Sequence, residues 1–345
     1  MKFGPVPVSA AQGAILAHSV DLDGKRLRKG VTLEASHIAA LIAAGHDSVI
    51  VARLDATDVH ENTAAAALAA ALVPDPAAAG LRLTAPFTGR VNILAEGPGV
   101  ALLDVAALGA VNAVDPMITL ATVPPFQQMG PGGMVATVKI IAYGVAGADL
   151  ARACAAGADA IRLAPPVLRR ATLIVTEIPG GLGSTEEQAP DVGPDKGRAA
   201  IEARLSALGM VLDRSVTVPH RTEALAAAIA AAASDLVLIL TGSATSDPDD
   251  VGPAALRLAG GHVERFGMPV DPGNLLFFGD LAGRAVIGLP GCARSPALNG
   301  ADWVLARIAC GLLVTGADIA AMGIGGLLKE IPSRPMPRAG RASNT

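Results

Sequence analysis

An unbroken apolar run followed at once by a polar turn marks residues 235–256, DLVLILTGSATSDPDDVGPAAL. Residues 236–240 have the length and composition of a strand covered on both faces of a parallel sheet. In open α/β sheets, ligands bind where the strands end at their carboxyl side. The segment therefore predicts an α/β sheet with a binding site at the turn that begins at Thr241.

Small and hydroxyl-bearing residues make up this turn, among them Thr241, Gly242, Ser243 and Thr245. Glycine lets the backbone approach a ligand closely, and hydroxyl groups donate hydrogen bonds. A helix expected at residues 251–258 would present unpaired amide groups to an anion. We interpret the turn as a phosphate-binding loop.

Three carboxylates, Asp247, Asp249 and Asp250, follow in the same turn and would repel a bare phosphate. They are candidates to contact a donor-rich ring or to transfer protons as catalytic groups, and Asp249 and Asp250 are candidates to hold Mg²⁺. The alternative is structural. Asp247 and Pro248 would then only cap and start the helix, at its N-cap and first positions.

Composition excludes several classes of protein. Hydrophobic residues make up 51% of the 345 residues but aromatic residues only 2%, so alanine and aliphatic side chains must build the cores. The alanine-rich runs at residues 64–73 and 224–233 are shorter than the roughly 20 residues that cross a bilayer. The net charge of −4 and the few aromatics argue against a nucleic-acid partner. The first residues form no apolar signal segment, so we expect a cytoplasmic protein without a membrane span.

Cysteines and histidines predict no metal site of their own. The cysteines, Cys154, Cys292 and Cys310, are too scattered for a disulfide framework or a zinc site. The histidines show no metal-ligand spacing, and we assign a catalytic role to none of them: His18, His37, His46, His60, His220 and His262.

Changes of pattern divide the chain into four parts. Residues 1–75 mix short strands with alanine-rich helices and end in a Pro-Asp-Pro stretch, which predicts a small α+β unit. Residues 80–165 carry short β-type runs broken by glycine and proline and a connecting helix, which predicts a β-rich domain. Residues 170–330 alternate strands and helices. Residues 331–345 have the Pro/Arg composition of a linker or a flexible tail.

The alternation in residues 170–330 predicts a mostly parallel sheet, because parallel neighbours need a helical crossover. Residues 178–197 interrupt it with a long polar, glycine-rich segment. Such loops serve as lids or binding segments, and disorder is the alternative.

Three motifs in residues 170–330 resemble those of a known family: TGSATSDPDDVGPAALRLAGG, FGMPVDPGNLLFF and AVIGLPGCARSP. In order and spacing they resemble the molybdopterin-binding domain shared by molybdopterin molybdenumtransferases and molybdopterin adenylyltransferases. A subgroup associated with molybdenum hydroxylase genes, sometimes fused to a molybdenum cofactor cytidylyltransferase, is more similar still, in its Leu-Pro-Gly-Cys turn and in a Gly-Ile-Gly-Gly-Leu ending at residues 323–327. The resemblance implies a three-layer αβα domain.

The resemblance also implies that molybdopterin contacts three turns, with a functional aspartate at Asp250. Asn274 stands where the family usually has lysine, and Cys292 where it has asparagine. Arg294 and Ser295 follow the third turn and would supply the missing positive charge, whereas we expect Arg257 to be a solvated surface charge. The implied cofactor-binding residues are Thr241, Gly242, Ser243, Thr245, Pro272, Gly273, Asn274, Pro290, Gly291 and Cys292.

Two functions follow from this resemblance. The first is a transferase of molybdenum cofactor biosynthesis that binds molybdopterin and assists molybdate insertion or, with Mg²⁺, nucleotide transfer. The second is a non-catalytic carrier that holds the cofactor for a fused or separate cytidylyltransferase or for a partner in molybdenum hydroxylase maturation. The resemblance implies a homo-oligomer in either case.

Overall fold

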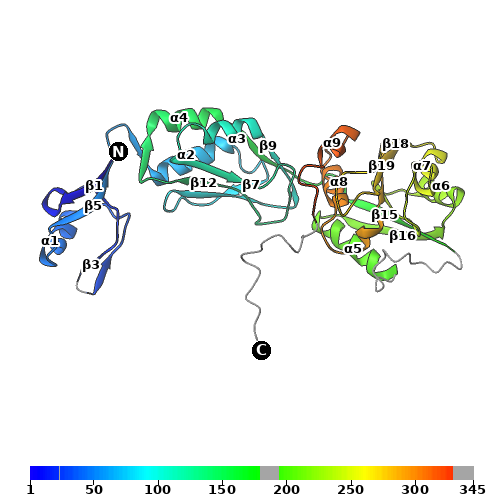
Figure 1. Ribbon diagram of the computed structural model, residues 1–345, viewed down its shortest axis with the longest axis horizontal. Helices are drawn as coiled ribbons and strands as arrows, with labels where there is room; N and C mark the ends of the chain where they lie inside the picture. The colour runs from blue at the N-terminus through cyan, green and yellow to red at the C-terminus, as the bar shows by residue number, and fades with distance from the viewer. Residues whose placement is uncertain (23, 179–193, 329–345) are drawn as a thin grey trace. The chain divides into compact units, whose positions relative to one another are not determined.

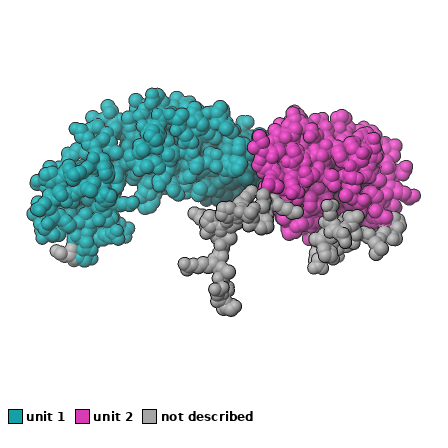
Figure 2. All heavy atoms as spheres, in the orientation of Figure 1, with its two compact units in different colours: residues 1–165 teal, residues 166–345 magenta. Residues whose placement is uncertain are grey.

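The computed structural model describes residues 1–22, 24–178 and 194–328, with only the backbone of residues 194–196. The expected tail at residues 331–345 and most of the expected loop at residues 178–197 lie outside this part. The chain divides into two compact units, residues 1–165 and 166–345, which Figure 2 colours separately.

The first unit begins with a small antiparallel sheet. Strand β5 (Ser48–Arg53) lies between β1 (Lys2–Pro7) and β2 (Ile15–Leu16), and helix α1 (Ala35–Ala43) packs against it through Leu41. Strands β3 (Val20–Leu22) and β4 (Lys25–Leu27) form a hairpin between β2 and α1. Backbone hydrogen bonds outside this hairpin join Leu16 to Val31 and Gly13 to Leu33.

The rest of the first unit surrounds one apolar core built largely from alanine, valine, leucine and isoleucine. Helix α2 (Glu61–Leu72) buries Leu68 and Leu72 in it, and helix α4 (Gly147–Ala156) buries Leu150. Helix α3 (Val105–Asn112), which the sequence analysis did not predict, buries Val111. The strands are β6 (Asp58–His60), β7 (Leu81–Leu83), β8 (Arg90–Ala95), β9 (Gly99–Leu103), β10 (Ile118–Thr122), β11 (Gln128–Met129), β12 (Met134–Ile140), β13 (Gly144–Ala146) and β14 (Ile161–Ala164).

A six-stranded sheet organises the second unit (Figure 1). Four neighbouring strands run parallel, as predicted: β16 (Val211–Pro219), β15 (Arg170–Glu177), β17 (Leu236–Leu240) and β20 (Arg284–Leu289). Two antiparallel strands that were not predicted, β19 (Phe277–Leu281) and β18 (His262–Phe266), complete the edge beside β20.

Strand β17 is covered on both faces, as its apolar run predicts. All of its residues are exposed by 1% or less. Val237 and Ile239 point into a core that helices α6 (Thr222–Ala231) and α7 (Val251–Leu258) share. Leu238 points to the opposite face, since side chains alternate along a strand. The remaining helices of the described unit are α5 (Pro194–Ala207), α8 (Gly300–Ala309) and α9 (Gly316–Ala321).

The register brings the carboxyl ends of the parallel strands to one edge. Leu240 lies opposite Val175 of β15 and opposite Leu289 of β20, and Glu177 lies opposite Pro219 of β16. The residues that follow each strand therefore meet at this edge, which we call the strand-end site. It comprises Thr176, His220, residues 241–246 and residues 290–295.

Candidate functional site

A hydroxyl at the end of β15 joins three strands. The Oγ1 atom of Thr176 accepts a hydrogen bond of 2.8 Å from the Gly242 amide and lies 2.8 Å from Nδ1 of His220. Either the Thr176 hydroxyl or an Nδ1–H group of His220 can donate this bond, depending on the tautomer of the imidazole.

The strand-end position of His220 was missed by sequence reasoning, which gave the histidines no role. Nothing in histidine spacing marks it. Its place directly after β16, in a sheet of parallel strands, is the signal that would have found it.

Gly242 is required at its position by a close backbone approach. A Cβ atom there would lie 2.6 Å from the carbonyl oxygen of Thr176, which is shorter than any ordinary contact. The glycine thus lets the loop after β17 turn tightly over the end of β15, where the Thr176 hydroxyl holds it.

The loop of residues 241–246 presents backbone donors. Thr241 and Thr245 are buried, and their hydroxyls lie 3.2 Å apart and bond to each other. Ser243 is exposed. The amides of Ser243, Ala244 and Thr245 have no acceptor among the described residues. Successive unpaired amides make a concavity that suits an anion.

The carboxylate of Asp250 accepts hydrogen bonds from backbone amides of its own segment. Asp250 is the N-cap of α7: one oxygen accepts the Val251 amide at 2.7 Å and the other the Ser246 amide at 3.1 Å. The expectation that Asp247 and Pro248 occupy the cap and first positions is therefore wrong. The capping carboxylate also takes the first amide of α7, so the helix start does not present that amide to an anion.

Asp247 and Asp249 lie on the exposed side of the same turn. Asp247 accepts the Asp249 amide at 2.8 Å. Arg257 donates to the carbonyl of Pro248 at 2.8 Å and pairs with Asp249 at 3.3 Å, so it binds the turn and is not merely a solvated charge. Within the described ranges no three His, Cys, Asp or Glu side chains are grouped to hold a metal ion.

The second predicted turn, Pro272 to Asn274, is held against the start of α8. The Pro272 carbonyl accepts the Gly300 amide at 2.9 Å. Gly273 has a φ of +146°, and a Cβ atom there would lie 3.0 Å from the Gly300 nitrogen. Asn274 is exposed, and its side-chain amide reaches the Met268 carbonyl at 3.4 Å.

The third predicted turn, Pro290 to Cys292, leads into a short helix of residues Gly291–Arg294. Cys292 is an exposed free thiol, and its sulfur accepts a hydrogen bond of 3.0 Å from the buried Asn299 side chain. Asn299 caps α8, next to the Gly300 amide that binds Pro272. The second and third turns are thus linked through the start of α8.

Arg204 of α5 fixes the backbone after the third turn, a role the sequence analysis did not foresee. Its guanidinium donates to the carbonyls of Ala293, Ser295 and Ala297 at 2.8–2.9 Å and pairs with Asp302. Both partners of this pair are nearly buried.

Arg294 links the third turn to the phosphate-binding loop. Its Nη2 atom donates to the carbonyl of Thr241 at 3.0 Å. The side chain is half-buried, and this burial lowers the pKa of the guanidinium from its usual value. The three predicted segments therefore form one chain of contacts, from Thr241 through Arg294 and Cys292 to Pro272.

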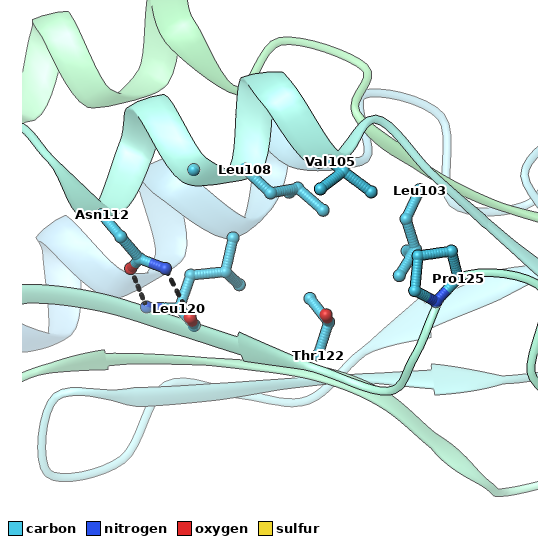
Figure 3. Close-up of a pocket in the computed structure, with 8 residues that line it drawn as sticks. Leu103, Val105, Leu108, Asn112, Leu120, Thr122 and Pro125 are labelled. Carbon is cyan, nitrogen blue, oxygen red and sulfur yellow. Dashed lines mark hydrogen bonds between the residues drawn. The ribbon is translucent and has the colours of Figure 1, made fainter. Parts of the chain in front are cut away.

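A separate cavity of about 250 Å³ lies in the first unit, between α3 and β10 (Figure 3). Its lining is mostly apolar and includes Leu108 and Thr122. Asn112 beside it has its amide bonded to the backbone of Leu120 in both directions. No residue of the predicted site lines this cavity.

Comparison with known families assigns a class to the segment that carries the strand-end site. Residues 174–307 match a family model described as "Probable molybdopterin binding domain". Residues 5–53 match a domain of unknown function, DUF8806. The match to the molybdopterin-binding family supports a place in molybdenum cofactor biosynthesis.

Solved structures and curated proteins were compared as well. A molybdopterin biosynthesis MoeA protein from Pyrococcus horikosii aligns at 15% identity with a TM-score of 0.31, over 90% of this chain and 75% of that one. A molybdenum cofactor biosynthesis protein from Pyrococcus furiosus aligns at 12% identity with a TM-score of 0.24, over 93% of this chain and 65% of that one. No curated protein matches the sequence. No described helix has the length and apolar content to cross a membrane.

Proposed function

We propose that the strand-end site binds molybdopterin and that the protein serves molybdenum cofactor biosynthesis through this binding. The observation that carries the proposal is the run of amides at Ser243, Ala244 and Thr245, which follow the Gly242 turn and have no acceptor within the described ranges. It lies inside the segment that matches a molybdopterin-binding family.

The residues present fit such a ligand. Molybdopterin carries one phosphate, and backbone amides with the Ser243 hydroxyl supply donors for an anion. Asp250 does not oppose that anion freely, because its two oxygens already accept the amides of Ser246 and Val251. The exposed Asn274 and Cys292, on turns joined to this loop, would complete the contacts to the rest of the cofactor.

A transferase role requires the carboxylates to act on the reaction. In molybdate insertion, Asp247, Asp249 or Asp250 would move protons as oxygen ligands leave the metal. In nucleotide transfer, Asp249 and Asp250 would hold Mg²⁺ against the nucleotide phosphates. Asp249 is the freer of the two, since its side chain is 91% exposed.

A carrier role is the second candidate, and the carboxylate contacts favour it. Asp250 is occupied as a helix cap and Asp249 is paired with Arg257. Asn274 brings no charge to the second turn. A carrier needs the donors of the strand-end site but no free catalytic carboxylate.

Retention of the cofactor tests the binding proposal. The full chain is incubated anaerobically with molybdopterin and passed through gel filtration, and the co-eluting pterin is measured by fluorescence after oxidation. We expect the wild type to retain pterin and Ser243→Pro, which removes one loop amide, to lose it. Ser243→Ala, which keeps the amide and removes only the hydroxyl donor, should retain more pterin than Ser243→Pro. Absence of pterin from the wild-type fraction would refute the proposal.

Turnover separates the two roles. Molybdate and Mg-ATP are added to the loaded protein, and metal incorporation and pyrophosphate release are followed. If the protein is a transferase, the wild type shows turnover and Asp249→Asn loses it. If it is a carrier, the wild type shows no turnover, and both the wild type and Asp249→Asn retain pterin. We further expect action in the cytoplasm, a homo-oligomer, and a cytidylyltransferase or hydroxylase-maturation partner as acceptor of the cofactor.

A further inference from the structure

Arg294 holds a fixed position beside the phosphate-binding loop. Its Nη2 atom donates to the Thr241 carbonyl at 3.0 Å. On its other side, a Cβ atom built on Gly197 of α5 would lie 3.4 Å from Cγ and 3.5 Å from Nη1 of Arg294. The side chain therefore lies between the backbone of α5 and the end of β17, and its orientation is set before any ligand arrives.

The charge of Arg294 has no counter-ion in the part of the chain that the structure describes. Three other arginines of the second unit pair with carboxylates, namely Arg198 with Glu202, Arg204 with Asp302, and Arg257 with Asp249. Arg265 and Arg284 donate to backbone carbonyls. The partner of Arg294 within the described ranges is the Thr241 carbonyl. A half-buried cation without an anion is unfavourable, and an anionic ligand would relieve the cost.

The geometry points to Arg294 as the residue that binds the phosphate monoester of the ligand, together with the loop amides of residues 243–245. This inference rests on the proposed function, because it assigns a specificity-determining contact to the same site. A guanidinium has five N–H groups in a rigid fork, and Nη2 gives one of them to Thr241. The remaining donors match phosphate oxygens, which a fork can bind in pairs.

This assignment explains how the site works without the lysine that the second turn lacks. Asn274 is neutral and its amide is turned to the Met268 carbonyl. Arg294 of the third turn supplies a positive charge instead, and this charge lies beside the Thr241 carbonyl. The ligand class is then a phosphorylated small molecule, and a ligand without phosphate should bind weakly.

The test compares three probes on the full chain by titration calorimetry: phosphorylated oxidised molybdopterin, the same pterin after phosphatase treatment, and inorganic phosphate. The variants are Arg294→Gln, which keeps a donor for Thr241, and Arg294→Lys, which keeps the charge but not the fork. Arg214→Gln, at an exposed arginine of β16, is the matched control. Circular dichroism and thermal unfolding check that each variant is folded.

We expect the wild type and Arg214→Gln to prefer the phosphorylated pterin to the dephosphorylated one by about ten- to a hundredfold, the effect of charged hydrogen bonds. Arg294→Gln should lose this preference while its affinity for the dephosphorylated pterin stays the same, and Arg294→Lys should keep part of it. If Arg294→Gln does not fold, Arg294→Lys tests the inference alone. It should prefer the phosphorylated pterin less strongly than the wild type does.

Two results overturn the inference, and they are distinct from failure of the proposed function. Equal affinity of the wild type for both pterins would leave pterin binding intact but remove the phosphate contact. An unchanged preference in Arg294→Gln would place the phosphate elsewhere. A third result would instead refute the proposed function. If the protein binds inorganic phosphate through Arg294 but binds neither pterin, the anion site exists and molybdopterin is not its ligand.

Discussion

The main-chain amide of Gly242 donates a hydrogen bond of 2.8 Å to the hydroxyl of Thr176, and this bond ties the loop after β17 to the end of β15. The same hydroxyl lies 2.8 Å from His220 at the end of β16. One buried threonine thus sets the relative position of three strand ends. The loop that presents the unpaired amides is held by this contact.

Replacing Thr176 by valine should weaken both the fold and ligand binding. The Gly242 amide would lose its acceptor, which costs about 1–3 kcal/mol in the free energy of unfolding. Thr176→Ser keeps the hydroxyl and should behave almost as the wild type. Urea unfolding and pterin retention measure the two effects.

The control for this variant is Thr172→Val in the same strand. Thr172 is equally buried, and its hydroxyl bonds to Ser234 at 2.8 Å, away from the strand ends. It should lower stability but leave retention of pterin unchanged. If both valine variants affect binding alike, the contribution of Thr176 to the site is only through overall stability.

Gly242→Ala should be destabilising because its Cβ atom would lie 2.6 Å from the Thr176 carbonyl oxygen. Forcing in this methyl group should cost about 1–3 kcal/mol. Gly291→Ala is the matched substitution, since a Cβ atom there meets no atom within 4 Å, and should change stability by less than about 0.5 kcal/mol. Equal midpoints of urea denaturation for the two variants would show that the tight turn at Gly242 is not required.

Arg204→Met should lower the free energy of unfolding by about 3–5 kcal/mol, because it leaves the nearly buried Asp302 without its cation. It also frees the three carbonyls that follow the third turn. Arg198→Met on the same helix removes an exposed pair with Glu202 and should cost at most about 1 kcal/mol. Denaturant titration of both variants measures the difference, and similar losses would contradict a structural role for the Arg204 cluster.

Acid should destabilise the second unit through Asp235. Its carboxylate accepts the amides of Arg169 and Arg170 at 2.9 Å each, and these bonds lower its pKa below the usual value. A carboxyl whose pKa is lower in the folded state contributes stability above its unfolded pKa of about 3.9 and loses it as the pH falls through the folded value. Thermal midpoints of the wild type should therefore drop below about pH 4. The drop should be smaller in Asp235→Asn, and identical pH profiles would exclude this contribution.

Most of the second unit could be predicted from the sequence because its pattern is strong. The apolar run of β17 and the helix α7 have the predicted bounds. The antiparallel edge was missed because β19, FFGDL, has a glycine within it and little alternation. Helix α3 was missed because its sequence, VAALGAVN, is short and has a glycine within it.

The residues of the site could be predicted more readily than their contacts. Turn motifs marked the segments at residues 241–250, 272–274 and 290–292, and the structure links them. Which carboxylate caps α7 depends on local backbone geometry that a run of aspartates leaves open. The roles of Arg204 and His220 depend on contacts between segments far apart in the chain, which no local pattern encodes.

The most direct test of molybdopterin binding at the strand-end site is amide hydrogen exchange of the full chain with and without the cofactor, read by peptide mass spectrometry. The amides of Ser243, Ala244 and Thr245 have no acceptor among the described residues, so they should exchange quickly in the free protein. We predict that molybdopterin slows exchange in the peptide covering residues 241–246. Unchanged exchange there, with protection in the peptide covering α3 and its cavity, would contradict this account.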